Sequence, residues 1–277
     1  MNIVCPKCNN KLGKLDELTL EGSACLKCDF SINYIEGVPI LYNDNIEDNL
    51  NQLNESSGLP TQNSEDLKIP IIQEALASGE WVLELGAGVD VCTNPRLIKT
   101  DAYLYSTDLH CLADAHSLPF EDNTFGYVYS LAVFEHLHSP WVAAEEILRV
   151  LKPGGKVYVL TAFMQHMHGY PNHYFNMTLS GLKQIFKEFD IESLRPSKWS
   201  SLNEIMYVMM DYVSLIKQSS ANLLTDNEMN LLDESFNQIC EINSKVDTYI
   251  NENANYEPSG YWSKIAPAVD IIAKKPE

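Results

Sequence analysis

The sequence has few basic side chains and no long hydrophobic run. Its 19 lysine and arginine residues stand against 38 aspartate and glutamate residues, which gives a formal net charge of −19. A negative field of this size repels polyanions, so a nucleic acid is a disfavoured partner. No apolar segment approaches the roughly 20 residues that a membrane-spanning helix needs. The sequence therefore predicts neither a nucleic-acid partner nor a membrane partner.

The first ten residues, MNIVCPKCNN, also lack the basic and apolar regions of a secretory signal peptide. Seven cysteines in a chain without such a signal indicate a reducing compartment, where paired thiols bind metal more often than they form disulfides. We therefore expect a cytoplasmic protein. A length of 277 residues, of which 45% are hydrophobic, fits one large α/β domain with a small appendage.

Four of the cysteines form two Cys-x-x-Cys pairs near the amino terminus. Cys5 and Cys8 are separated from Cys25 and Cys28 by sixteen residues, a spacing typical of a tetrahedral zinc ribbon. Four thiolates close the coordination shell, so the pattern favours a structural Zn²⁺ over a catalytic one. The other three cysteines are expected to be buried as small apolar groups.

The composition divides the chain into a zinc ribbon over residues 1–42, a polar linker over 43–66 and an α/β domain over 67–277. Helices are expected over Leu67–Ser78, over Ser139–Leu151 and over about 179–188. Strands are expected at Trp81–Leu85, Ala102–Thr107, Tyr127–Leu131, Lys156–Leu160, Phe189–Leu194 and Ala268–Ala273. This order predicts a Rossmann-like, doubly wound, mostly parallel sheet. A helical insertion at about 202–251 precedes the last strand and is expected to cap the active site or to form a homodimer contact.

The first strand of the α/β domain runs into Gly86-Ala87-Gly88. Such a junction fits a loop for S-adenosylmethionine (SAM), a dinucleotide loop or an ordinary strand-to-turn connection. The third glycine of a dinucleotide loop is absent, and Glu84 places a carboxylate beside the turn, where it would repel a pyrophosphate but not the ammonium group of SAM. Asp108 comes directly after the expected second strand. It lies about 20 residues after the glycine turn, the spacing at which a carboxylate binds ribose hydroxyls. These features favour SAM.

Four further runs occur in a fixed order. They are ADAHSLPF at Ala113–Phe120, NTF at Asn123–Phe125, FEHL at Phe134–Leu137 and EILRVLKPGG at Glu146–Gly155. Together they resemble the class I, type 11 SAM-dependent methyltransferases over about residues 80–162. The resemblance implies that the methionine part of SAM is held by Glu84, Gly86 and Gly88, the ribose by Asp108, and the adenine by Asp114 and Ala115, while Leu131 lines the floor of the pocket.

The amino-terminal unit also resembles a known module. Its two cysteine pairs and the segment Gly37-Val38-Pro39-Ile40-Leu41 are similar to the zinc ribbon of the small activator subunit of tRNA and protein methyltransferases. The α/β part departs from its family in length. About fourteen residues separate Gly88 from the expected second strand, and five separate Asp108 from Asp114. Two helices of the family are therefore expected to be shortened or absent, which leaves a more open pocket.

Methyl transfer from a sulfonium requires an aligned acceptor, exclusion of water and, for a hydroxyl acceptor, removal of a proton. The candidate catalytic residues are His136, His168 and His173, because histidine titrates near neutral pH. An equally good interpretation of His136 is that it ties a loop to the crossover helix. A metal site at the loop histidines has no carboxylate partner at helical spacing and ranks low.

The loop around His168 also resembles type 11 enzymes that tailor bacterial surface sugars or natural products. The resemblance implies O-methylation of a small molecule or a glycan. The alternatives are an RNA methyltransferase, against which the net charge argues, an inactive binding partner that retains the fold, and a dehydrogenase.

Overall fold

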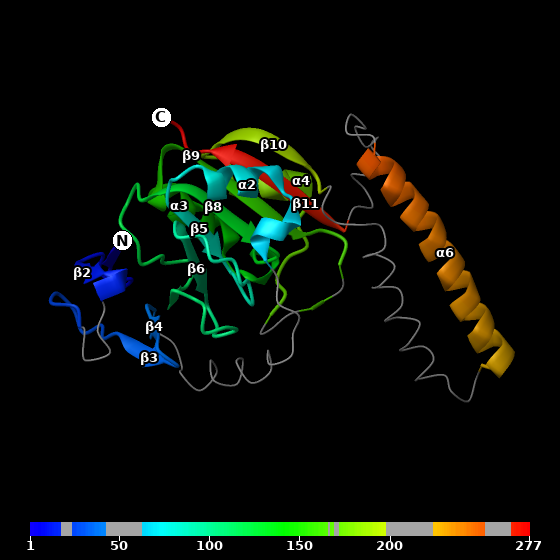
Figure 1. The fold of residues 1–277 in the computed structure, drawn as a ribbon, viewed down its shortest axis with the longest axis horizontal. Coiled ribbons are helices and arrows are strands. Elements are labelled where there is room, and N and C mark those ends of the chain that lie inside the picture. The colour runs from blue at the N-terminus through cyan, green and yellow to red at the C-terminus, as the bar shows by residue number, and fades with distance from the viewer. Residues whose placement is uncertain (18–23, 43–62, 166, 169–171, 198–223, 253–266) are drawn as a thin grey trace.

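A computed structural model describes residues 1–17, 24–42, 63–165, 167–168, 172–197, 224–252 and 267–277 (Figure 1). These residues form a nine-stranded mixed sheet and a separate two-stranded sheet. The strands of the large sheet are β3 (Asn33–Ile35), β4 (Val38–Ile40), β5 (Val82–Leu85), β6 (Leu97–Asp101), β7 (Cys111–Leu112), β8 (Phe125–Leu131), β9 (Leu151–Ala162), β10 (Asp190–Pro196) and β11 (Ala268–Lys274). The small sheet pairs β1 (Asn2–Val4) with β2 (Lys11–Lys14).

The large sheet has the order β10-β11-β9-β8-β5-β6-β7-β4-β3. Neighbouring strands from β9 through β8, β5 and β6 to β7 run parallel, whereas β11 lies antiparallel to β9 and β10 antiparallel to β11. This arrangement confirms the predicted Rossmann-like, mostly parallel α/β fold. Because the carboxyl ends of parallel strands meet at one edge of a sheet, that edge is where such folds bind ligands.

Helices cover both faces of the sheet (Figure 1). The short helices are η1 (Leu15–Glu17), η2 (Ser64–Leu67) and η3 (Phe134–His136), and the longer ones are α2 (Pro70–Ala77), α3 (Pro140–Val150), α4 (Leu179–Ile185) and α6 (Asp226–Glu252). Successive side chains of a strand point to opposite faces. On β5, Leu83 therefore shares a buried cluster with Ile147 of α3, whereas Val82 shares one with Ile72 of α2. No described helix is long and apolar enough to cross a membrane.

Most of the expected elements are present with shifted ends. The crossover helix is α3, and the last strand is β11. The predicted second strand at Ala102–Thr107 is wrong, because the strand β6 covers Leu97–Asp101 instead. Its sequence, LIKTD, looks too polar for a central strand, but the structure buries Lys99 with its ammonium group on the carbonyl oxygen of Asp90, at 2.8 Å. Of the expected linker and insertion, residues 43–62 and 202–223 lie outside the described residues, and α6 forms the rest of the insertion.

The amino-terminal unit extends the large sheet. Ile40 of β4 pairs in parallel with Leu112 of β7, and the backbone N–H of Leu41 donates to the carbonyl oxygen of Leu112 at 2.8 Å. The unit also belongs to the main hydrophobic cluster, which contains Cys5 and Phe30 together with residues of β5, β6 and α3. The fully described stretches from Leu85 to Leu97 and from Asp101 to Cys111 contain no helix, as the short spacings predicted. Through this hydrophobic cluster the amino-terminal unit packs on the α3 side of the sheet, and its strands β4 and β3 extend the sheet beyond β7.

Candidate functional site

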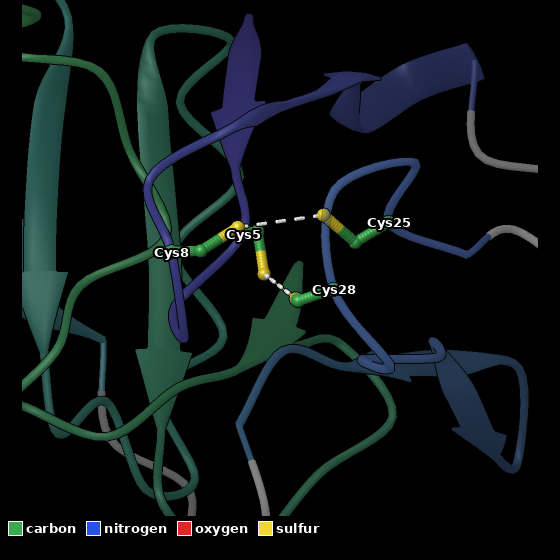
Figure 2. Close-up of side chains that lie close together, drawn as sticks. All are labelled: Cys5, Cys8, Cys25 and Cys28. Atoms are coloured by element: carbon green, nitrogen blue, oxygen red, sulfur yellow. Dashed lines mark hydrogen bonds between the residues drawn. The ribbon is translucent and has the colours of Figure 1, made fainter.

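The four amino-terminal cysteines converge as the spacing predicted (Figure 2). The Sγ atoms of Cys5 and Cys28 lie 3.5 Å apart, as do those of Cys8 and Cys25, and all four lie within 4.8 Å of one another. Four thiolates at about 2.3 Å from a tetrahedral Zn²⁺ stand about 3.8 Å apart. The cluster therefore fits a zinc ion. Hydrogen bonding from the backbone N–H of Lys27 lowers the pKa of Cys25 to about 6, which favours the thiolate that a metal binds.

A carboxylate at the end of β6 holds the glycine loop. Asp101 accepts a hydrogen bond from the backbone N–H of Gly88 at 3.0 Å and another from that of Tyr103 at 3.1 Å. Burial raises the pKa of Asp101 to about 6, although these two hydrogen bonds lower it in part. Sequence reasoning missed Asp101, because the second strand was placed five residues too late. Asp101 is thus the carboxylate that follows the second parallel strand.

Asp108 does not follow a strand. It is exposed in the turn between β6 and β7, where its backbone N–H bonds the hydroxyl of Ser106 at 3.1 Å. The prediction that Asp108 binds the ribose depended on a strand at Ala102–Thr107, but the structure places Asp101, and not Asp108, at the end of the second parallel strand. Both Asp101 and Asp108 stand at an acceptable distance from the glycine turn along the sequence. Only the tertiary structure shows which of the two ends a strand.

Glu84 lies on the α2 side of the sheet, 3% exposed. Its Oε2 atom is buried and has no hydrogen-bond partner among the described residues, and the same is true of Oδ2 of the neighbouring Asp90. Burial, followed by the proximity of Asp90, raises the pKa of Glu84 well above its ordinary value. A cation such as the ammonium group of SAM would relieve this unfavourable pair, so the residues present fit the predicted cofactor.

The glycine loop touches the segment that follows β8. Gly86 has φ of +77°, and a Cβ atom there would lie 2.2 Å from Cγ2 of Val133. Gly88 has φ of +54°, but nothing lies within 4 Å of the position of its Cβ. Leu131, predicted to line the floor, ends β8 and precedes Ala132, whose φ of 55° turns the chain toward η3. The first glycine is therefore required by a close contact, and the second only by its backbone conformation.

The predicted adenine residues form a polar turn after β7. Asp114 accepts hydrogen bonds from the backbone N–H of His116 at 2.9 Å and from its Nδ1 at 2.6 Å. Burial raises the pKa of Asp114, but the hydrogen bonds from His116 outweigh this effect and lower it. Ala115 is buried. The ring of His116 stacks on that of His138, with centroids 4.1 Å apart. Nothing in the sequence had indicated that His116 bonds Asp114 and stacks on His138.

The three predicted catalytic histidines meet at the same edge of the sheet. The ring centroids of His136, His168 and His173 lie between 4.6 and 5.6 Å apart. Beside them stands Glu135, which is fully buried and accepts a hydrogen bond from the hydroxyl of Thr161 at 2.8 Å. Sequence reasoning missed this carboxylate. The charge of His136 acts on Asp101 and lowers its pKa, so the histidines lie near the strand-end carboxylate.

Residues 79–159 match the family model described as Methyltransferase domain. The demethylmenaquinone methyltransferase of Corynebacterium urealyticum is 28% identical over 161 residues, which are 53% of this chain and 68% of that protein. The protein of the same description from Bacillus licheniformis is 28% identical over 134 residues, 44% of this chain and 56% of that protein. Thus the chain spans between about half and two thirds of the length of these relatives.

Solved structures resemble the chain more weakly. One is the complex between the Haloferax volcanii Trm112 methyltransferase activator and a methyltransferase, at 15% identity and a TM-score of 0.45, covering 84% of this chain and 98% of that one. Another is the [4+2]-cyclase SpnF, at 15% identity and a TM-score of 0.44, covering 82% and 92%. At these values neither structure bears on the chemistry of this chain.

Proposed function

We propose that this SAM-dependent methyltransferase transfers the methyl group to a hydroxyl oxygen of a small molecule or a glycan. The observation that carries the proposal is the cluster of histidines around Glu135, at the sheet edge that also carries Asp101. Imidazole and carboxylate groups bind a hydroxyl and take up its proton near neutral pH. A neutral amine acceptor is the stronger nucleophile and attacks the methyl group without first losing a proton, so it has less need of such groups.

The cofactor side uses residues of three strand ends. Asp101 would accept hydrogen bonds from the ribose hydroxyls, Asp114 would face the adenine, and Glu84 would offset the ammonium charge. When bound, SAM supplies an electrophilic methyl group on a sulfonium. The protein then has to align the acceptor oxygen, exclude water and remove one proton. Burial and the charge of His168 lower the pKa of His173, whose Nδ1 accepts a hydrogen bond from the backbone N–H of His168.

The amino-terminal unit would hold Zn²⁺ in a structural role. Its four thiolates complete a tetrahedral shell and leave no position for a substrate. The support for this assignment is the convergence of all four sulfurs and the packing of Cys5 within the main hydrophobic cluster. Zinc would thereby stabilise the unit that extends the sheet beyond β7.

Isothermal titration of the metal-loaded protein with SAM, and separately with S-adenosylhomocysteine, tests the cofactor side. Saturable micromolar binding is expected. Asp101→Asn should weaken it at least tenfold, about 1.4 kcal/mol, because a carboxylate that accepts ribose hydroxyls is lost. Asp108→Asn is the matched control and should leave the affinity unchanged. If a folded protein binds neither compound, the site is not functional and the chain acts as a binding partner.

An acceptor screen then tests the reaction. Hydroxyl-bearing sugars and small molecules are the first set, with release of S-adenosylhomocysteine as the measurement. Demethylated quinones form the second set, because the relatives in Corynebacterium urealyticum and Bacillus licheniformis carry the name demethylmenaquinone methyltransferase. An unmodified tRNA pool serves as the third set. The net charge of −19 predicts no transfer to RNA.

A further inference from the structure

One carboxylate in the histidine cluster has a hydrogen-bond partner for only one of its two oxygens among the described residues. Glu135 is fully buried, and Thr161 bonds its Oε2 atom at 2.8 Å. Its Oε1 atom has no hydrogen-bond partner in the part of the chain that the structure describes. Nε2 of His168 lies 3.9 Å from Oε1, which is beyond hydrogen-bond distance. A positive charge in front of this buried carboxylate oxygen would compensate the cost of removing it from water.

The tautomer of His136 is determined by its neighbour. Nδ1 of His136 lies 2.8 Å from the carbonyl oxygen of Asn172, and a carbonyl oxygen can only accept a hydrogen bond. Nδ1 therefore carries the proton, and Nε2 of the neutral ring keeps its lone pair. Histidines that bind a metal through one nitrogen usually donate the other N–H to a carbonyl or a carboxylate. His136 thus has the arrangement of a metal ligand.

His173 has a different position in the cluster. Its Nδ1 accepts from the backbone N–H of His168 at 3.4 Å, and its Nε2 lies 3.1 Å from Oδ1 of Asn176. The amide of Asn176 is oriented by its Nδ2 group, which donates to the carbonyl oxygen of Gln165 at 2.9 Å. Because both ring nitrogens of His173 are used, it orients the backbone of His168 and has no nitrogen left for an ion.

Ligand atoms of Glu135, His136 and His168 lie within 4.8 Å of one another. An ion at about 2.1 Å from Oε1 of Glu135 and from Nε2 of His168 spans their separation of 3.9 Å. The loop is also tied to the backbone of Glu135, since the backbone N–H of Tyr174 donates to the carbonyl oxygen of Glu135 at 2.7 Å. The loop histidines have no carboxylate partner at helical spacing. Glu135, on a separate segment of the chain, supplies that carboxylate.

We propose that Glu135, His136 and His168 form a second metal site, for a single divalent first-row transition metal such as Zn²⁺. Two imidazoles and one carboxylate are the donor set of such ions when coordination positions stay open. The open positions would take an oxygen of the acceptor, a role that rests on the proposed function. Metal binding itself is independent of SAM and of the acceptor, so the two proposals can fail separately.

The test is a Co²⁺ titration of the protein loaded with one equivalent of Zn²⁺, after loss of reactivity toward a thiol reagent has shown that the four thiolates hold this ion. One Co²⁺ per chain is expected, with d–d absorption but no thiolate-to-cobalt charge-transfer band. His136→Ala and His168→Ala should each weaken binding at least about a hundredfold. His173→Ala should weaken it about 10–100-fold, as loss of a supporting residue does. His138→Ala is the matched control, because His138 is an exposed histidine two residues from His136.

Three results would overturn the metal site. They are the absence of a second bound ion in the wild-type protein, a second ion that binds equally well in the His136 and His168 variants, and a charge-transfer band that places the cobalt on the cysteines. Circular dichroism of each variant checks the fold, and the wild-type titration decides the question if a variant does not fold. Cobalt binding without SAM binding would sustain the metal site and refute the proposed methyl transfer.

Discussion

The hydroxyl of Ser117 donates a hydrogen bond of 2.7 Å to the carbonyl oxygen of Pro6. Pro6 lies inside the first cysteine pair, and Ser117 lies at the end of the turn that contains Asp114. A second bond joins the same two segments, from the backbone N–H of Val4 to the carbonyl oxygen of Pro119 at 3.0 Å. The cysteine cluster and the predicted adenine turn therefore belong to one hydrogen-bonded unit, so loss of metal at the first should affect the second.

Loss of the amino-terminal metal should destabilise the whole α/β domain. A structural zinc contributes on the order of 10 kcal/mol to small zinc domains, and Cys5 shares its hydrophobic cluster with the central strands. Cys28→Ser should abolish metal binding at the four cysteines, lower the unfolding free energy by several kcal/mol and weaken SAM binding. Cys240→Ser in α6 is the control. Thermal unfolding with metal analysis checks the prediction, which fails if the metal-free protein unfolds at the wild-type temperature.

The two glycines of the loop should differ in their tolerance of alanine. Gly86→Ala brings its Cβ atom to 2.2 Å from Val133 and also imposes a positive φ, whereas Gly88→Ala imposes only the positive φ. The backbone conformation alone costs an alanine about 1–2 kcal/mol. Chemical denaturation should therefore show a larger loss for Gly86→Ala, and Val133→Ala should restore part of it. Equal losses for the two variants would contradict the role of the contact.

SAM affinity should increase with pH around the pKa of Asp101. Burial raises this pKa from 3.8 to about 6, and an ionised carboxylate accepts ribose hydroxyls more strongly than a protonated one. Affinity should therefore rise between pH 5 and pH 7, a change that Asp101→Asn removes and Asp108→Asn retains. Because the folded pKa is the raised one, the folded protein without cofactor loses stability as pH rises from 3.8 to about 6. Titration calorimetry at several pH values measures the first effect.

Glu84→Gln should increase stability and reduce function. The pKa of Glu84 is raised, so its ionisation costs the folded state free energy above the pKa of the unfolded chain. The amide removes this cost, and its N–H₂ group can donate to the unpartnered Oδ2 of Asp90. At pH 7 the variant should unfold at a higher denaturant concentration, but bind SAM at least tenfold more weakly, about 1.4 kcal/mol. Stronger SAM binding by this variant would refute the role of Glu84.

Sequence reasoning reached the α/β fold and most of its strands because the central strands are apolar on both faces. It failed at β6, where buried Lys99 and Thr100 make a central strand look like a loop. These polar side chains are satisfied by backbone carbonyl oxygens of Asp90 and Glu84, which lie on other segments. A local pattern cannot reveal such partners. Because this strand was misplaced, the sequence prediction assigned the strand-end carboxylate to Asp108, whereas the structure places Asp101 there.

The sequence by itself predicted the cysteine cluster from the spacing of its two Cys-x-x-Cys pairs, although the fold is what brings Cys5 to Cys28 and Cys8 to Cys25. It also identified the three histidines by their chemistry. The tertiary structure decided which groups share a site. It joined Glu135 to His168, bonded Arg149 of α3 to the carbonyl oxygen of Phe120 at 2.7 Å, and seated the amino-terminal unit on β7. These contacts join residues far apart along the chain, so strand order and packing create them, and no local spacing encodes them.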